Sequence, residues 1–200
     1  MKFNNLKLLV IGLFVLLVST AQAQTEKSLW RGLQSGDYIV LMRHALAPGI
    51  GDPPQMQLER CETQRNLNEV GRAQARRIGA VFKAQGLSQA EVYSSEWCRC
   101  LETAQLLGLG NVQRLSELNS FFTQPNRAQS QTMALKTGLV TARPKHPLVL
   151  VTHQVNITEL TKVFPQSGEL VFIKKPSHLN DEIIVQGRIQ TLDEFTAREP

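Results

Sequence analysis

The sequence DYIVLMRH, residues 37–44, places a strand-like segment directly before two reactive side chains. Residues 37–42 form a short apolar run rich in β-forming side chains, which is typical of a strand in the core of a sheet. Arg43 and His44 follow at its carboxyl end, and a loop rich in Pro and Gly occupies residues 48–54. This stretch therefore predicts a core strand with an arginine and a histidine at its tip.

A second strand of the same kind, PLVLVT at residues 147–152, is followed by His153. Between the two, a short strand is predicted over Glu91–Ser95, and the helix predicted over Trp97–Leu107 carries Arg99 in its first turns. The other predicted elements are a helix capped by Asn68 that runs to Gln85, a strand over Val112–Leu115, a helix over Asn126–Leu139, a helix that begins near Asn156, and closing strands over Glu169–Ile173 and Glu182–Gln186.

This alternation of strands and helices predicts an α/β fold, a three-layer α/β/α sandwich around a mostly parallel central sheet. In such sheets ligands bind beyond the carboxyl ends of the strands. Arg43, His44 and His153 all follow such ends, so we expect them to meet at one rim of the sheet.

The residue types at this rim suit the chemistry of a phosphate group. Arg43 and Arg99 can bind a dianion through their guanidinium groups, and the start of a helix offers free N–H groups to it. A neutral imidazole, at His44 or His153, can attack phosphorus and carry the phosphoryl group covalently. The set therefore predicts a site that binds and transfers phosphate.

Four motifs, in this order, resemble the histidine phosphatase superfamily: Leu41-Met42-Arg43-His44-Ala45, Leu67-Asn68-x-x-Gly71-x-x-Gln74-Ala75, Tyr93-Ser94-Ser95-x-x-x-Arg99-x-x-x-Thr103-Ala104 and Val151-Thr152-His153. The resemblance spans about residues 37 to 160 and implies a phosphoglycerate mutase-like fold. It implies that His44 is the nucleophile that accepts the phosphoryl group, that Arg43 and Arg99 bind the phosphate, and that His153 completes the site. It implies no metal and no other cofactor.

The resemblance also suggests roles for Glu117 and Arg65, and for each of them a non-functional interpretation stays open. Leu115-Ser116-Glu117 fits the pattern that carries the proton donor of the family, so Glu117 is the candidate general acid; an exposed loop glutamate is the alternative. Arg65 could reach the mouth of the site and touch substrate, although a solvated loop arginine is the simpler interpretation.

Three departures from the family pattern bear on the reaction. Ala45 follows His44 where Gly is commonest, and Gln154 follows His153 where Gly or Glu is usual. Residues 119–122 replace a Gly-rich segment that is common in mutases, and the short chain leaves little room for a lid. Because a mutase needs a closed site that excludes water, these departures favour hydrolysis.

The length and charge of the chain limit its partners. Its 200 residues, 42% of them hydrophobic, are enough for one domain with a core. The formal net charge of +5 comes without a block of Lys and Arg, so a nucleic-acid partner is not expected.

The first 23 residues resemble an export signal, with Lys2 and Lys7 before an apolar run and the small-residue pattern Ala21-Gln22-Ala23 at its end. We expect cleavage after Ala23, a histidine phosphatase domain over residues 24–200, and a periplasmic or secreted protein. A retained anchor is the alternative, but the run Leu8–Val18 is shorter than the ~20 residues that a membrane span needs. No stable membrane span is therefore expected after cleavage.

Three cysteines, Cys61, Cys98 and Cys100, fit one disulfide and one free thiol in an oxidising compartment. Cys98 and Cys100 point to nearly opposite sides of a helix, so only one of them can face Cys61. We predict the pair Cys61–Cys98, with Cys61–Cys100 left open. No CxxC pair or histidine spacing indicates a zinc site, and a redox or metal-handling protein is a remote alternative.

Together these features predict an exported phosphomonoesterase that acts on a small-molecule phosphate ester through phosphorylated His44. Export, and a likeness to small exported members of the family that remove phosphate from heptose of the lipopolysaccharide core, favour a phosphorylated sugar of the cell envelope. The loops Ala45–Cys61 and Phe121–Ala142 are expected to shape specificity. The alternative is a binding protein that holds a phosphorylated ligand on a catalytically silent fold. The sequence leaves the oligomeric state open.

Overall fold

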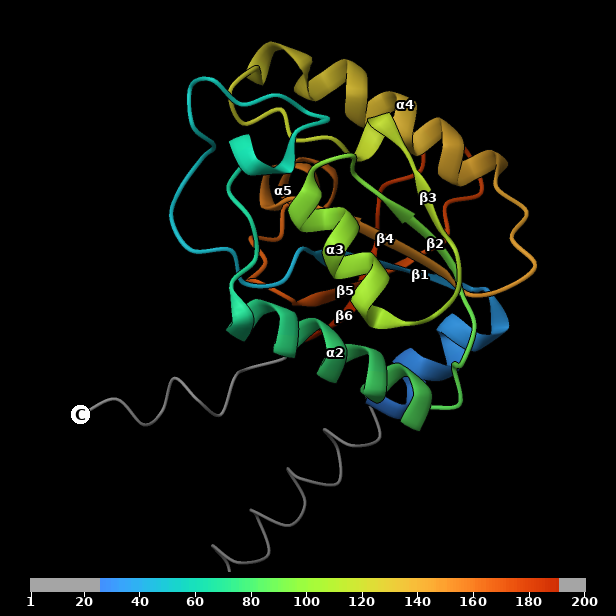
Figure 1. The fold of residues 1–200 in the computed structure, drawn as a ribbon. Helices are drawn as coiled ribbons and strands as arrows, with labels where there is room; N and C mark the ends of the chain where they lie inside the picture. The colour runs from blue at the N-terminus through green and yellow to red at the C-terminus, as the bar shows by residue number, and fades with distance from the viewer. Residues whose placement is uncertain (1–25, 191–200) are drawn as a thin grey trace, which may run out of the picture.

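The computed structural model describes residues 26–190, in which one six-stranded sheet lies between two layers of helices (Figure 1). The strands are β1 (Tyr38–Arg43), β2 (Glu91–Ser94), β3 (Val112–Arg114), β4 (Leu148–Thr152), β5 (Leu170–Lys174) and β6 (Val185–Ile189). The helices are α2 (Glu69–Ala84), α3 (Cys98–Leu107), α4 (Ala128–Thr141) and α5 (Gln154–Thr161), with a further helix over residues 26–35 and 3-10 turns η1 (Cys61–Thr63), η2 (Ser116–Leu118) and η3 (Pro125–Arg127).

The sheet has the order β3-β2-β4-β1-β5-β6. The first four strands in that order run parallel, whereas β5 pairs antiparallel with β1 and β6 antiparallel with β5. The predicted sandwich with a mostly parallel sheet is therefore confirmed.

Strand β1 occupies the middle of the sheet because it is apolar on both sides. Val40 and Met42 face the core beneath residues 26–35, α2 and α3, whereas Ile39 and Leu41 face the core beneath α4 and α5. The four side chains are buried almost completely, which fits a central strand covered on both faces.

The register of the parallel strands brings the predicted residues together. Arg43 pairs with Thr152, so β1 and β4 end at the same level, and Ser94 at the end of β2 pairs with Val151. The ends of β1 and β4 and the start of α3 consequently lie at one rim of the sheet (Figure 1). His44 and His153 directly follow these two strand ends.

Helix α2 begins as the sequence predicts. Asn68 Oδ1 accepts a hydrogen bond from the Gly71 backbone N–H (2.8 Å), which satisfies one of the free donors of the first turn. The helix ends before Gly86, which has a φ of 80°, a conformation that glycine adopts without strain.

Some of the predicted bounds are wrong. The closing strand predicted over Glu182–Gln186 is β6, Val185–Ile189, which pairs antiparallel with β5 and has a register shift between Phe172 and Ile173. Helix α5 begins at Gln154, directly after His153, and not near Asn156.

The helix over residues 26–35 was not predicted. Leu29, Trp30 and Leu33 bury its apolar side in the core, and the Trp30 ring packs edge-on against Phe82 and Phe172 with centroids 5.0 and 5.4 Å apart. The three spaced apolar residues are a helical pattern, but the polar residues between them obscure it.

The predicted signal segment, residues 1–23, lies outside the described residues. Within residues 26–190, no helix is both long and apolar enough to cross a bilayer.

Candidate active site

His44 lies at the end of β1, and a hydrogen bond shows which of its two ring nitrogens carries the proton. Its backbone N–H donates to Thr152 O (2.9 Å), and its Nδ1 lies 2.7 Å from Ala45 O. Because a carbonyl oxygen only accepts, Nδ1 carries the proton and Nε2 keeps its lone pair. The ring is thus prepared to act as a nucleophile through Nε2.

The turn after His44 is fixed by side chains of the second and third motifs. The Ala45 N–H donates to Thr103 Oγ1 (3.0 Å), and the Leu46 N–H donates to Gln74 Oε1 (2.9 Å). Ala45 is fully buried, so the methyl group that replaces the usual glycine hydrogen fits into the core at this point.

His153 lies beside His44 at the end of β4. The two ring centroids are 5.6 Å apart, and the Trp97 ring packs edge-on against His153 with centroids 5.4 Å apart. His153 Nε2 lies 2.8 Å from Ser95 Oγ, whose own hydroxyl donates to Asn119 Oδ1 (3.2 Å). Because the Ser95 hydroxyl uses its proton on Asn119, its oxygen accepts a hydrogen bond from His153, so the ring proton of His153 lies on Nε2.

Two arginines complete the cluster. Arg99, in the first turn of α3, is only 3% exposed, and its Nη2 lies 3.4 Å from His153 Nδ1. Arg43 is half-buried and donates from Nη1 to Pro165 O (2.9 Å). The Nε atoms of both arginines are buried without a hydrogen-bond partner among the described residues. Because a buried unpaired donor is costly, these atoms are natural donors to a bound anion.

The electrostatics keep both imidazoles neutral. Burial, followed by the positive charge of Arg99, lowers the pKa of His44 well below its ordinary value. The same two causes, in the same order, lower the pKa of His153. Neutral imidazoles beside guanidinium groups combine a nucleophile with anion binding, as the sequence predicts.

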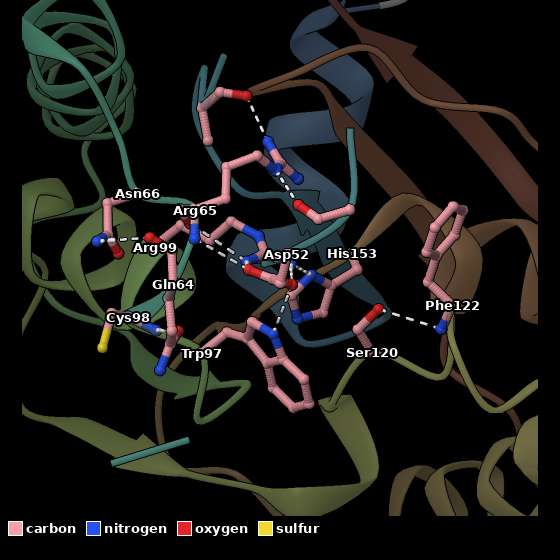
Figure 2. Close-up of polar contacts among 12 residues, drawn as sticks. Asp52, Gln64, Arg65, Asn66, Trp97, Cys98, Arg99, Ser120, Phe122 and His153 are labelled. Atoms are coloured by element: carbon pink, nitrogen blue, oxygen red, sulfur yellow. Dashed lines mark hydrogen bonds and ion pairs between the residues drawn. The ribbon is translucent and has the colours of Figure 1, made fainter. Parts of the chain in front are cut away.

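Asp52 also belongs to this cluster, although the sequence analysis did not single it out. Its Oδ1 and Oδ2 accept from Arg99 Nη1 (2.7 Å) and Nη2 (3.1 Å), and it also accepts from Trp97 Nε1 (3.1 Å) and the Arg65 backbone N–H (3.1 Å). Figure 2 shows these contacts converging on the carboxylate next to His153. The only feature of the sequence that could have pointed to Asp52 is that it is the single charged residue in the Gly- and Pro-rich loop after His44.

The structure places Arg65 as a support of that loop. Its Nε donates to Gly51 O (2.7 Å), and its Nη1 donates to Ala47 O. Burial, followed by the charge of Arg99, lowers the pKa of Arg65. The guanidinium therefore fixes the backbone that carries Asp52.

The structure places Glu117 away from the histidines. Glu117 lies in η2, where it accepts a hydrogen bond from Ser116 Oγ (3.2 Å) and lines a cavity of about 400 Å³ beneath α4 with Leu115 and Leu135. The next residue, Leu118, is fully buried in the core on the α4 side. The structure therefore brings together His44, His153, Arg43 and Arg99, but not Glu117.

Cys61 and Cys98 form a disulfide, as predicted, which joins η1 to the first residue of α3. The bond fastens the polypeptide that follows the Asp52 loop next to Arg99.

Cys100 is the free thiol; it lies 3.5 Å from His153 Nε2, and burial raises its pKa to about 12. A thiol with this pKa is inert as a nucleophile near neutral pH. No three His, Cys, Asp or Glu side chains within residues 26–190 are grouped to hold a metal ion.

Comparison with known proteins finds one matching family model. Residues 39–121 match the model of the histidine phosphatase superfamily, branch 1; this segment contains His44, Arg43 and Arg99. No curated protein matches the sequence.

Solved structures share the fold at low sequence identity. The protein histidine phosphatase SixA complexed with tungstate has a TM-score of 0.55 at 15% identity, covering 77% of this chain and 97% of that chain. A mycobacterial glucosyl-3-phosphoglycerate phosphatase complexed with VO3 has a TM-score of 0.51 at 20% identity, covering 69% and 92%. A phosphoserine phosphatase from Entamoeba histolytica in complex with 3-phosphoglyceric acid has a TM-score of 0.52 at 14% identity, covering 76% and 96%.

Proposed function

We propose that this chain is a histidine phosphatase that hydrolyses phosphate monoesters through a covalent phosphohistidine at His44, and the match of residues 39–121 to the model of that superfamily supports the proposal. The observation that carries the proposal is the assigned proton on His44 Nδ1, donated to Ala45 O (2.7 Å), which leaves Nε2 unprotonated. The match of residues 39–121 to the family model and the phosphatases among the structural neighbours support a phosphoric monoester hydrolase.

The first half-reaction transfers the phosphoryl group to the protein. His44 Nε2 attacks phosphorus, an N–P bond forms, and the P–O bond to the alcohol breaks. The unpartnered Nε atoms of Arg43 and Arg99 are available to donate to the phosphoryl oxygens, where negative charge is concentrated. His153, with its ring centroid 5.6 Å from that of His44, borders the same reacting group.

The second half-reaction returns His44 to its free state. Water attacks phosphorus, the N–P bond breaks, and inorganic phosphate leaves with the water oxygen. The lowered pKa of His44, caused first by burial and then by Arg99, makes its neutral imidazole a competent leaving group and nucleophile over a wide pH range.

The substrate we propose is a small phosphate ester, in particular a phosphorylated sugar of the cell envelope. The signal-like residues 1–23 support export to the periplasm or the medium, where envelope sugars are found. The names of the structural neighbours support small phosphorylated substrates, since they include phosphatases of glucosyl-3-phosphoglycerate and of phosphoserine.

The test is hydrolysis by the purified protein of p-nitrophenyl phosphate and of a panel of sugar phosphates, nucleotides, phosphopeptides and inositol phosphates. We expect release of phosphate that persists in EDTA and falls by at least ~1,000-fold in His44→Ala, since removing a covalent nucleophile removes the pathway. His146→Ala is the matched control, because His146 is exposed in the turn before β4. Full activity of His44→Ala would contradict the proposal. Tight binding of a phosphorylated ligand without turnover would favour the binding-protein alternative.

A further inference from the structure

The geometry points to Asp52 as the general acid and base of this hydrolysis. The inference rests on the proposed function and adds to it the residue that moves the proton. The sequence pattern assigns this role to Glu117, whose carboxylate lines the cavity beneath α4. A proton donor must lie within hydrogen-bond reach of the leaving oxygen, directly or through one water molecule.

Asp52 lies on the guanidinium that holds the phosphate in the proposed reaction. Its carboxylate accepts from both terminal nitrogens of Arg99, at 2.7 and 3.1 Å, and Arg99 Nη2 in turn lies 3.4 Å from His153 Nδ1. Any phosphate held by Arg99 therefore lies next to Asp52. The side chain of Asp52 is 14% exposed, so it has limited access to water.

The carboxylate is held on a rigid support. Trp97 Nε1 and the Arg65 backbone N–H donate to it, each at 3.1 Å, and the Arg65 guanidinium donates to carbonyls of the same loop, including Gly51 O (2.7 Å). These contacts come from two separate segments of the chain, at Arg65 and at Trp97. A group that acts in catalysis needs such fixed placement.

Substrate binding changes the charge around Asp52 in the required direction. In the free protein burial raises the pKa of Asp52, but the hydrogen bond and charge of Arg99 outweigh it, so the pKa is lowered. The other groups that face the carboxylate are Arg65 and the buried thiol of Cys100. A dianion that binds Arg99 competes for its positive charge and adds negative charge nearby, and both effects favour a protonated Asp52.

The proton balance closes over one turnover. As His44 Nε2 displaces the ester oxygen, the Asp52 carboxylic acid gives its proton to that oxygen and the alcohol leaves. The Asp52 carboxylate then takes a proton from the water that attacks phosphohistidine. Inorganic phosphate leaves, and Asp52, again beside an unoccupied Arg99, releases to solvent the proton that it took up when the substrate bound.

The experiment compares two esters that differ in their need for an acid. β-Glycerophosphate has an alkoxide leaving group that must be protonated, whereas the phenolate of 2,4-dinitrophenyl phosphate leaves without a proton. kcat/KM is measured for both because it reports the formation of phosphohistidine even when its hydrolysis limits kcat. For Asp52→Asn we expect a loss of about 100-fold or more with β-glycerophosphate and less than about 5-fold with the dinitrophenyl ester.

Matched variants separate this role from others. Glu59→Gln removes an exposed carboxylate from the same loop and is expected to change neither ester by more than about 2-fold. Asp52→Glu keeps an acid and is expected to recover part of the rate with β-glycerophosphate; this variant also covers the case in which Asp52→Asn does not fold.

Each other outcome overturns the assignment. If kcat/KM of Asp52→Asn falls equally with both esters, Asp52 only holds Arg99 in place. If kcat/KM rises equally with both, Asp52 only competes with the substrate for Arg99. An ester-dependent loss in Glu117→Gln instead assigns the acid to Glu117. If the unaltered protein hydrolyses neither ester, and His44→Ala behaves as the unaltered protein, it is the proposed function that fails.

Discussion

Gly71 and Leu46 are in backbone-to-backbone contact: a β-carbon on Gly71 would overlap the carbonyl oxygen of Leu46. Gly71 lies in the first turn of α2, and Leu46 lies two residues after His44. Gln74, one helical turn further on, accepts from the Leu46 N–H (2.9 Å). Helix α2 thus supports the turn that holds the His44 ring, which explains why the second motif requires a glycine and a glutamine at this spacing.

Replacement of Gly71 by alanine is expected to lower both stability and activity. The added methyl meets backbone and not a flexible side chain, so the helix or the turn must shift, at a cost of about 1–3 kcal/mol. Because the turn carries Ala45, whose carbonyl orients His44, we also expect a fall in kcat of about 10- to 100-fold. Urea unfolding and steady-state kinetics measure the two effects. A variant with unchanged unfolding midpoint and kcat would show that the contact does not matter.

Gly138→Ala is expected to have the opposite effect on stability. Gly138 lies inside α4, and no atom stands within 4 Å of its added β-carbon. Alanine should therefore stabilise the protein by about 0.5–1 kcal/mol, because it reduces the conformational freedom of the unfolded chain. The urea midpoint should rise while hydrolysis is unchanged. A lower midpoint would mean that α4 packs more tightly than the structure shows.

The cysteines are expected to behave as one disulfide and one inaccessible thiol. Burial raises the pKa of Cys100 to about 12, so the folded protein should not react with iodoacetamide at pH 8. In denaturant without reductant one thiol should be labelled, and after reduction three, since Cys61 and Cys98 are paired. Intact mass after labelling counts the thiols. Three labels without reductant would contradict the disulfide.

The meeting of His44 and His153 at one rim of the sheet, and a disulfide that includes Cys61, could be predicted from patterns in the sequence. A strand with a short apolar run ends at Arg43-His44, and parallel strands align their carboxyl ends, so His153 had to lie nearby. Helix geometry showed that Cys98 and Cys100 cannot both face Cys61, but only the structure decides that Cys98 is the partner.

Asp52 and Glu117 could not be placed in this way. The carboxylate of Asp52 meets Arg99, 47 residues later, only after the loop is folded and held by Arg65. In the sequence alone, an aspartate between Gly and Pro residues indicates only a turn. Glu117 has the spacing of the family pattern, but its direction is decided by the 3-10 turn η2 and by the burial of Leu118 on the α4 side.

The two buried histidines are expected to make the protein less stable in acid before its carboxylates titrate. In the folded protein the pKa values of His44 and His153 are lowered, first by burial and then by Arg99. Below about pH 6.5 the unfolded chain therefore binds protons that the folded protein does not, so stability falls as the pH falls. The slope is about 1.4 kcal/mol per pH unit for each histidine.

Urea unfolding between pH 7.5 and 5 measures this slope. His44→Ala should lower the slope by about 1.4 kcal/mol per pH unit, which is the contribution of one histidine. His146→Ala should leave the slope unchanged, because His146 is exposed. Equal slopes in the unaltered protein and His44→Ala would mean that His44 is accessible to protons in the folded state.

Ser95 is expected to position His153 for the reaction. Ser95 Oγ lies 2.8 Å from His153 Nε2 and donates to Asn119 Oδ1 (3.2 Å), so it accepts the proton of the ring and fixes its orientation. In Ser95→Ala the buried Nε2–H loses its oxygen partner and the ring can rotate, so we expect kcat to fall by about 10- to 100-fold with a smaller change in KM. Ser94→Ala is the control, because Ser94 is equally buried but its hydroxyl donates to Ser95 O (2.8 Å). Ser95→Thr, which restores the hydroxyl, should recover activity. Equal losses in Ser94→Ala and Ser95→Ala would reduce the effect to a general loss of packing at the end of β2.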